Sequence, residues 1–526
     1  MKRRKTTVTH VGTSTFIGGD YDIVVQSMTT TNTNDTEACV AQIRRIVKAG
    51  GQMVRLTTQG VREAENMKNI SIRLKEVMAA SSAAPSPSAA SSPSAAPSPS
   101  AAPSPSAPSA APSPSLQGGP GRVSIPLVAD VHFNARVADV AAQYCEKVRI
   151  NPGNYVDPAR TFRQLEYTDA EYQAELEKID ARFVPFLRIC REHHTAIRIG
   201  VNHGSLSDRI MSRYGDTPAG IVESCMEFLR ICKREMFNDV VISIKASNTV
   251  VMVQSVRLLV EAMDREDMHY PLHLGVTEAG EGEDGRIKSA VGIGALLTEG
   301  IGDTIRVSLS EEPECEIPVA RKLVSFIPEC AAKREAAEIT DDGTLHLYFA
   351  EVNYENLQLK AAMTAGALLI DGKAHNLVIH NEYAPVVYEH PQPYLTIGHH
   401  VTDFKPLADS ILQAARVKFT KPEYISCPGC GRTLYDLQQT IARIKAAINH
   451  EAETDPRFKT LKIGIMGCIV NGPGEMADAD YGYVGAGPGR VSLYKQKECV
   501  EKNIPEADAV EKLLQLIKTT LAPKGC

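Results

Sequence analysis

The sequence has no excess of positive charge, and this absence excludes one large class of function. Its 57 Lys and Arg residues face 63 Asp and Glu residues, which leaves a formal charge of -6 on 526 residues. A chain with this balance has no general attraction for nucleic acid or for anionic membranes. We therefore expect small molecules and proteins as its partners.

Long apolar runs are also missing. No stretch is long and apolar enough for a transmembrane helix, and the N-terminal Met-Lys-Arg-Arg-Lys is followed by Thr-Thr-Val-Thr-His instead of the apolar core of a secretory signal. We expect a cytoplasmic protein. Its 12 cysteines should then be mostly reduced, so clustered ones are better candidates for metal ligands or catalytic thiols than for disulfides.

One segment cannot contribute to a folded core. Residues Ala79 to Ser115 consist only of Ala, Ser and Pro, and they carry 10 of the 31 prolines of the chain. Such a composition is typical of an extended, solvated spacer. We interpret it as a disordered linker inserted into a folded domain, after a helix expected over Val61 to Met78.

Around this linker, short β-branched strands alternate with helical patterns. The strands share a design, because each runs from apolar residues into a polar or charged C-terminal end. They are expected at residues 23–28, 52–57, 125–132, 147–151, 196–202, 240–247, 272–278 and 304–308. Eight such βα units predict an α/β fold of the (β/α)8 TIM-barrel type over residues 1–310, with its active site at the C-terminal ends of the strands.

Two smaller regions follow the barrel. Residues 311–420 are expected to form an α/β insertion, with a strand at Gly366 to Asp371 and helices near Leu357 and Leu407. Residues 421–526 predict a small α/β domain, since they alternate helical and strand patterns at 434–449, 461–466, 490–494 and 506–521.

The strongest chemical signal lies in this last domain. Cys427 and Cys430 form a Cys-Pro-Gly-Cys motif before a helix, and Cys468 stands where a strand opens into a Gly/Pro loop. Three thiolates can bind a metal centre that needs a fourth ligand, and Glu475 and Cys499 are the candidates. A carboxylate would be an exchangeable ligand, so that one iron could open for substrate. A fourth thiolate would instead make a closed structural zinc or electron-transfer site. The spacing alone leaves zinc and iron-sulfur open, and a thiol redox pair is a weaker third alternative.

Polar side chains at the barrel strand ends form a second constellation. Any one of them could be a loop cap or an ion-pair partner, but five are cationic and would suit a phosphorylated anion if they converge. The residues are Arg55, Asp130, His132, Arg149, Asn151, Asn154, Arg198, Asn202, Lys245, Glu278, Arg306 and Ser308.

Several of these motifs together resemble one enzyme family. They include Ala129-Asp-Val-His-Phe, Val148-Arg-Ile-Asn-Pro-Gly-Asn, Gly275-Val-Thr-Glu-Ala-Gly, Cys427-Pro-Gly-Cys and Gly467-Cys-Ile-Val-Asn-Gly-Pro-Gly-Glu. The pattern is similar to the 4-hydroxy-3-methylbut-2-enyl diphosphate synthase family of the non-mevalonate isoprenoid pathway. The resemblance implies an oxidoreductase with a 4Fe-4S cluster that reductively opens and dehydroxylates 2-C-methyl-D-erythritol 2,4-cyclodiphosphate, with ferredoxin or flavodoxin as electron donor.

The same resemblance implies roles for individual residues. The cluster ligands would be Cys427, Cys430, Cys468 and Glu475. Asp130, His132 and Glu278 would lie near the reacting carbons, with Glu278 as the candidate acid/base. The residues expected to hold the diphosphate are Arg55, Arg149, Asn154, Arg198, Asn202, Lys245, Arg306 and Ser308.

The chain departs from the family pattern in its linker and in the region from Glu311 to Lys421. That region is longer than in two-domain bacterial forms and shorter than the extra barrel of three-domain forms. The sequence therefore leaves open whether barrel and cluster domain pair within one chain or across a homodimer. A barrel lyase or transferase, or a sensor of a phosphorylated ligand, with a structural zinc tail in either case, is the alternative to the reductase.

Overall fold

The central feature of the computed structural model is a closed parallel barrel. The structure describes residues 2–83, 125–157, 165–383, 386–388, 399–401, 403–469, 472–476 and 478–521. Its eight-stranded sheet has the order β8-β7-β6-β5-β4-β3-β10-β9, and a parallel bridge between Ile242 and Leu272 joins the two ends. The strands are β3 (Val24–Met28), β4 (Met53–Thr58), β5 (Leu127–Val131), β6 (Lys147–Ile150), β7 (Ala196–Asn202), β8 (Val240–Lys245), β9 (His273–Leu274) and β10 (Thr304–Ile305). The predicted TIM barrel is confirmed.

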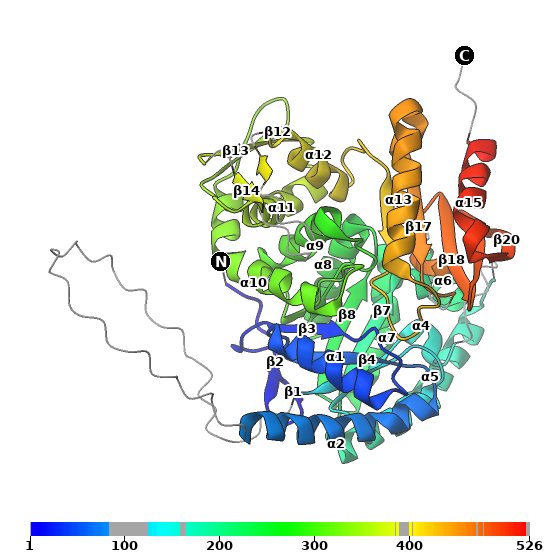
Figure 1. The fold of residues 1–526 in the computed structure, drawn as a ribbon. Coiled ribbons are helices and arrows are strands. Elements are labelled where there is room, and N and C mark those ends of the chain that lie inside the picture. Colours follow the sequence, from blue (N-terminus) through cyan, green and yellow to red (C-terminus); the bar gives the residue numbers. More distant parts are fainter. Residues whose placement is uncertain are drawn as a thin grey trace, which may run out of the picture.

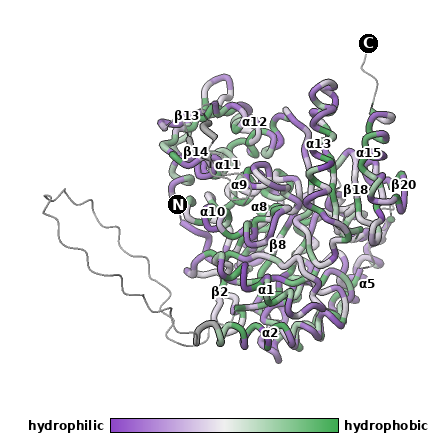
Figure 2. Tube along the Cα trace, in the orientation of Figure 1, coloured by the Kyte–Doolittle hydropathy of each residue, from purple (hydrophilic) through white to green (hydrophobic). Residues whose placement is uncertain are grey.

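Helices cover the outside of the barrel (Figure 1). They are α1 (Thr36–Lys48), α2 (Val61–Ala83), α3 (Ala135–Ala141), α4 (Pro152–Tyr155), α5 (Asp169–Glu192), α6 (Asp208–Tyr214), α7 (Pro218–Arg234), α8 (Thr249–Arg265), α9 (Gly282–Leu297) and α10 (Glu316–Glu335). Helix α1 begins where the Asp35 side chain accepts a hydrogen bond from the Ala38 N–H, a typical N-cap. Figure 2 shows hydrophobic and hydrophilic residues alternating along outer helices such as α2, as expected for helices with one face on the core.

Helix α2 is longer than predicted. It ends at Ala83, five residues beyond the expected end at Met78 and therefore inside the Ala/Ser/Pro segment. Those extra residues are Ala and Ser, and the first proline, Pro85, comes only after them, so nothing stops the helix before it. Residues 84–124, which contain the rest of the predicted linker, lie outside the described residues.

A hairpin closes the N-terminal end of the barrel. It consists of β1 (Thr9–Val11) and β2 (Thr15–Ile17), and its Val11 and Ile17 side chains are fully buried. They pack against the first or second residues of five strands: Val24, Met53, Val128, Ala196 and Val241. The opposite end, where the polar strand ends lie, is thus left for the site.

The insertion is a small sheet covered by helices. Strands β11 (Glu338–Ile339), β12 (Thr344–Phe349) and β13 (Asn376–Asn381) form the sheet, and α11 (Tyr354–Ile370) and α12 (Lys405–Ala414) are its helices. A separate hairpin joins β14 (Val386–Tyr388) and β15 (His399–Val401).

The predicted strand at Gly366 to Asp371 is wrong, because these residues end α11. This helix is buried almost all round, so its apolar run has the same appearance as a buried strand. It packs tightly against α9: a Cβ on Gly366 would lie 2.6 Å from the Val291 carbonyl oxygen. The helices expected near Leu357 and Leu407 are confirmed as α11 and α12.

The C-terminal domain is a five-stranded sheet with two long helices. Its elements are β16 (Glu423–Ser426), α13 (Leu437–Thr454), β17 (Lys462–Met466), α14 (Gly472–Glu475), β18 (Tyr481–Gly487), β19 (Arg490–Lys495), β20 (Glu498–Pro505) and α15 (Glu506–Thr520). The two helices and two strands predicted here are confirmed within a few residues. Strands β16, β18 and β20 were missed, since β18 is rich in glycine and β20 is rich in charge.

Figure 1 shows this domain on the side of the barrel opposite the β1–β2 hairpin, over the strand ends. Among the helices that the structure describes, none combines the length and apolar character that crossing a membrane would require.

Candidate active site

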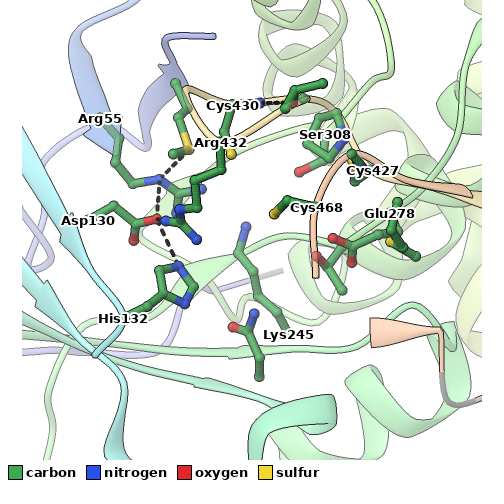
Figure 3. Close-up of a pocket in the computed structure, with 18 of the residues that line it drawn as sticks. Arg55, Asp130, His132, Lys245, Glu278, Ser308, Cys427, Cys430, Arg432 and Cys468 are labelled. Carbon is green, nitrogen blue, oxygen red and sulfur yellow. Dashed lines mark hydrogen bonds and ion pairs between the residues drawn. The ribbon is translucent and has the colours of Figure 1, made fainter. Parts of the chain in front are cut away.

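One pocket lies between the barrel mouth and the C-terminal domain of the same chain (Figure 3). Most of the predicted site residues line it, because the barrel strands are parallel and all end at this face. From the barrel they are Arg55, Asp130, His132, Arg149, Arg198, Asn202, Lys245, Glu278, Arg306 and Ser308. From the C-terminal domain they are Cys427, Cys430 and Cys468.

Asp130 is the centre of the cationic part of this pocket. Its carboxylate lies 3.1 Å from Nε2 of His132 and between 3.5 and 3.9 Å from nitrogens of four arginines. The arginines are Arg55, Arg149, Arg198 and Arg432. Burial opposes ionisation of Asp130, but the charges of Arg55 and Arg149 outweigh it and hold its pKa well below the usual range.

The imidazole of His132 is neutral at physiological pH. Burial lowers its pKa to about 3, and the charges of Arg149 and Arg432 act in the same direction. A neutral ring can accept one hydrogen bond, and Nε2 lies 2.8 Å from Nη1 of Arg149. His132 therefore holds a guanidinium in place without adding charge.

Arg306 and Arg198 differ in how well carboxylates and other acceptors pair with their guanidinium groups. Arg306 is held by both oxygens of Glu316, at 2.8 and 3.0 Å. Arg198 is 2% exposed, and its Nε and Nη1 atoms have no hydrogen-bond partner among the described residues. Burying donors without acceptors is unfavourable. The pocket is therefore poised for an anion with several acceptor oxygens.

Glu475 lies beside this cationic region although it does not line the pocket itself. The amide nitrogen of Asn202 donates a hydrogen bond to its carboxylate, and the side chain is 4% exposed. Burial raises the pKa of Glu475 well above its usual value, and the charge of Glu278 raises it further. Glu278 has φ of +48°, a strained conformation for a residue with a side chain, and burial raises its pKa as well.

Close backbone packing brings Glu475 to the barrel. Gly204 lies in a single 3-10 turn after β7 (residues His203–Ser205), and Gly474 lies in α14. A Cβ on Gly204 would come within 2.1 Å of the Gly474 carbonyl carbon, so this approach requires glycine. The Ser247 hydroxyl also donates to the Glu475 carbonyl oxygen at 3.2 Å.

Other contacts also join the barrel to the C-terminal domain. The Ser310 hydroxyl lies 2.9 Å from that of Ser426 and donates to the Cys427 carbonyl oxygen at 2.9 Å. Lys288 on α9 pairs with Glu423 on β16 at 2.7 Å. Barrel and C-terminal domain thus complete the pocket within one chain.

The three cysteines are positioned by the ends of two adjacent parallel strands. Cys427 follows β16, Cys430 lies in the next turn and Cys468 follows β17. The Gly467 N–H donates to Sγ of Cys427 at 3.2 Å, while burial raises the pKa of this thiol to about 12. A cation would be needed to keep it as a thiolate. In the described part of the chain, no three His, Cys, Asp or Glu side chains already converge on a single metal position.

Some predicted residues lie elsewhere. Asn154, on the short helix α4, is buried but does not line the pocket, and Asn151 donates to Oγ of Ser205 at 2.9 Å. Cys499, the alternative fourth ligand, lies on β20, packs beside the apolar cluster of Met466, Met476 and Tyr494, and does not line the pocket.

The sequence analysis missed several lining residues, above all Arg432 and Met28. Arg432 stands two positions after Cys430, so its place in the cysteine loop was the available signal. Met28 ends β3, and its sulfur accepts a hydrogen bond from Nε of Arg55 at 3.1 Å. No polarity pattern marks a methionine for this position.

Comparisons with known proteins agree with this architecture. The model of the GcpE TIM-barrel domain matches residues 6–85 and 114–321, and that of the GcpE protein C-terminal domain matches residues 423–519. The interruption between the first two ranges falls in the Ala/Ser/Pro segment.

Curated relatives are similar over nearly their whole length. The chain is 47% identical to "4-hydroxy-3-methylbut-2-en-1-yl diphosphate synthase (flavodoxin)" of Bacteroides fragilis, over 98% of this chain and 96% of the relative. It is 47% identical to the enzyme of that name from Phocaeicola vulgatus, over 98% of both chains. The corresponding Porphyromonas gingivalis enzyme is 41% identical, over 98% of this chain and 97% of the relative.

The first of these alignments runs over 664 positions, more than the 526 residues of this chain, so the relative carries segments that this chain lacks. Sequence identity and domain matches nevertheless cover both the barrel and the cysteine-bearing domain. The chain belongs to the GcpE family of 4-hydroxy-3-methylbut-2-en-1-yl diphosphate synthases.

Proposed function

We propose that this chain reductively opens and dehydroxylates 2-C-methyl-D-erythritol 2,4-cyclodiphosphate to give 4-hydroxy-3-methylbut-2-enyl diphosphate. The reaction consumes two electrons and two protons and releases the hydroxyl oxygen as water. The observation that carries the proposal is that one pocket joins a cation-rich barrel mouth to three cysteines. A phosphorylated substrate and an electron-transfer centre would meet there.

The barrel residues bind and orient the substrate. Arg55, Arg149 and Arg198 are buried and share the Asp130 carboxylate as a counter-ion, and Lys245 is buried in the same pocket. A diphosphate would supply the missing negative charge and many acceptor oxygens. Asn202, Arg306 and Ser308 complete this set, and Asn154 belongs to it by family resemblance alone.

The cysteine-bearing loops suit an iron-sulfur cluster. Cys427, Cys430, Cys468 and Glu475 would hold a 4Fe-4S cluster, and the raised pKa of the Cys427 thiol and of the Glu475 carboxyl fits a site that a metal centre would complete. When bound, the cluster would supply electrons one at a time and a Lewis-acidic iron beside the exchangeable carboxylate.

Acid/base work falls to the carboxyl groups at the barrel mouth. Glu278 is buried, and burial raises the pKa of its carboxyl, which favours the protonated form that a general acid for a leaving hydroxyl requires. Asp130 and His132 are proposed to lie near the reacting carbons, where Asp130 stays ionised and His132 stays neutral.

The electron donor and the setting are also part of the proposal. Flavodoxin is the donor named for the curated relatives, and ferredoxin is the other candidate for this chain. A cytoplasmic location is consistent with such donors. Since barrel and cluster domain meet within one chain, a homodimer would not be needed to complete the pocket.

An anaerobic turnover assay tests this function. The purified protein, supplied with the cyclodiphosphate and a strong one-electron reductant, should form 4-hydroxy-3-methylbut-2-enyl diphosphate. A lyase, a transferase or a sensor with a zinc tail would not consume reducing equivalents. Consumption of the substrate without oxidation of the reductant would refute the proposal.

A further inference from the structure

Among the described residues, Arg432 is the one cation that the C-terminal domain contributes to the lining of the pocket. It lies in the turn after Cys430, before α13, and Figure 3 shows its side chain reaching from the Cys430 loop towards Asp130 and Arg55. All the other lining cations stand on barrel strands or, for Arg306, directly after one. The charge of Arg432 therefore enters the pocket only when the C-terminal domain is seated on the barrel.

The guanidinium of Arg432 is buried without adequate partners. The residue is 7% exposed, its Nε has no hydrogen-bond partner among the described residues, and its Nη2 lies 3.8 Å from the Asp130 carboxylate, beyond hydrogen-bond distance. Asp130 already faces three other arginines and His132. One carboxylate cannot satisfy that many donors, so an acceptor-rich anion is missing from the arrangement.

We propose that Arg432 binds the anionic phosphate oxygens of the substrate and thereby couples anion binding to the seating of the C-terminal domain. This inference rests on the proposed function only in taking the anion to be a diphosphate. The coupling follows from connectivity, because Arg432 is two residues from Cys430 and moves with the cysteine loop. An anion that contacts both Arg432 and the barrel cations has a higher affinity for the seated arrangement and shifts the population towards it.

The same arrangement gives Asp130 a second role. Before substrate binds, its carboxylate is the shared counter-ion of Arg432 and of the barrel arginines. A bound diphosphate would take over part of this role. Arg432 would then exchange a long ion pair for direct hydrogen bonds, which makes it a substrate-binding residue and not only an interface residue.

The test uses inorganic pyrophosphate as the probe and the anaerobically purified full-length protein with its metal content intact. Isothermal titration calorimetry compares the wild type with Arg432→Met, Arg432→Lys and the control Arg457→Met, whose guanidinium pairs with Asp455 and does not line the pocket. Because hydrogen bonds to charged groups are strong, Arg432→Met should weaken pyrophosphate binding about 10- to 100-fold, with Arg432→Lys in between and Arg457→Met unchanged.

Hydrogen–deuterium exchange provides the readout for coupling. In the wild type, pyrophosphate should slow exchange in β16 and in α14, two of the segments that contact the barrel. In Arg432→Met, saturating pyrophosphate should slow it less. Pyrophosphate affinity of Arg432→Met within about threefold of wild type would overturn the proposal, and so would equal ligand-induced protection in both proteins. An unchanged visible spectrum shows that a variant is folded. If Arg432→Met does not fold, Arg432→Lys replaces it as the test variant.

The binding experiment is independent of turnover. If the wild type binds pyrophosphate through Arg432 but does not reduce the cyclodiphosphate, the proposed function fails while the role of Arg432 in anion binding stands. If it reduces the substrate and Arg432→Met binds pyrophosphate normally, the inference fails while the function stands.

Discussion

The side-chain amide of Asn202 donates a hydrogen bond to the carboxylate of Glu475, although 273 residues separate them in the sequence. Asn202 ends barrel strand β7, whereas Glu475 ends α14 of the C-terminal domain. The contact places the proposed fourth cluster ligand directly against the proposed substrate site. It also shows how the two constellations found in the sequence become one site.

Replacing Glu475 by Ala should leave iron bound but abolish most turnover. Three cysteines remain to hold the cluster, whereas the exchangeable carboxylate and its bond to Asn202 are lost. We expect normal or slightly reduced iron content and at least a tenfold loss of kcat, a cost of about 1.4 kcal/mol or more in activation free energy. Iron analysis and anaerobic assays check this, with the exposed Glu453→Ala as control. Normal activity in Glu475→Ala would refute the assigned role.

Replacing Cys468 by Ser should abolish the cluster, whereas Cys499→Ser should retain it. Both cysteines are half-buried in the same domain, but only Cys468 lines the pocket. Visible absorption and acid-labile sulfide distinguish the two variants. Loss of the cluster in Cys499→Ser, with retention in Cys468→Ser, would show that Cys499 is a cluster ligand and that Cys468 is not.

Adding a methyl group at Gly204 should disturb the seating of Glu475. A Cβ there would meet the Gly474 backbone at 2.1 to 2.3 Å, and backbone atoms cannot rotate away. Gly204→Ala should therefore lose turnover while keeping its iron. Gly487→Ala is the matched control, because the nearest atom to its added Cβ is 4.0 Å away. Equal activity of the two variants would show that the contact between Gly204 and Gly474 does not position the site.

Replacing Lys245 by Met should weaken substrate binding and leave the cluster spectrum unchanged. The buried ammonium group is a proposed diphosphate ligand, so we expect kcat/KM to fall about 10- to 100-fold. Lys178→Met, on the exposed face of α5, is the control. A bleached spectrum in Lys245→Met would contradict the separation between substrate-binding and cluster-binding residues.

The same variant reports on domain pairing. A mixed sample of Lys245→Met and Cys468→Ser should show no more activity than its Lys245→Met component alone, because each chain completes its own pocket. Recovery of activity on mixing would mean that a barrel works with the cysteines of a second chain.

The barrel could be predicted from the sequence because its strands are near-continuous apolar runs with polar ends. The same polar ends gave Arg55, Arg149, Arg198, Lys245 and Arg306, and the parallel strands bring them together. Helix α11 could not be distinguished from a strand, since burial on all sides removes the periodicity that separates the two.

Contacts between distant segments were beyond sequence reasoning. The approach of Gly204 to Gly474 and the position of Arg432 near Asp130 depend on how the C-terminal domain sits on the barrel. The division of the chain at residues 310 and 420 stays a prediction. The roles assigned to the site residues also stay predictions, which the experiments above address.

The most direct test of the central claim needs no substrate. The protein is purified without oxygen, and its iron, acid-labile sulfide and zinc are measured together with its visible absorption. The account predicts about four iron and four sulfide per chain, as a 4Fe-4S cluster requires. One zinc per chain without sulfide would contradict it and would favour a barrel enzyme or sensor with a structural zinc tail.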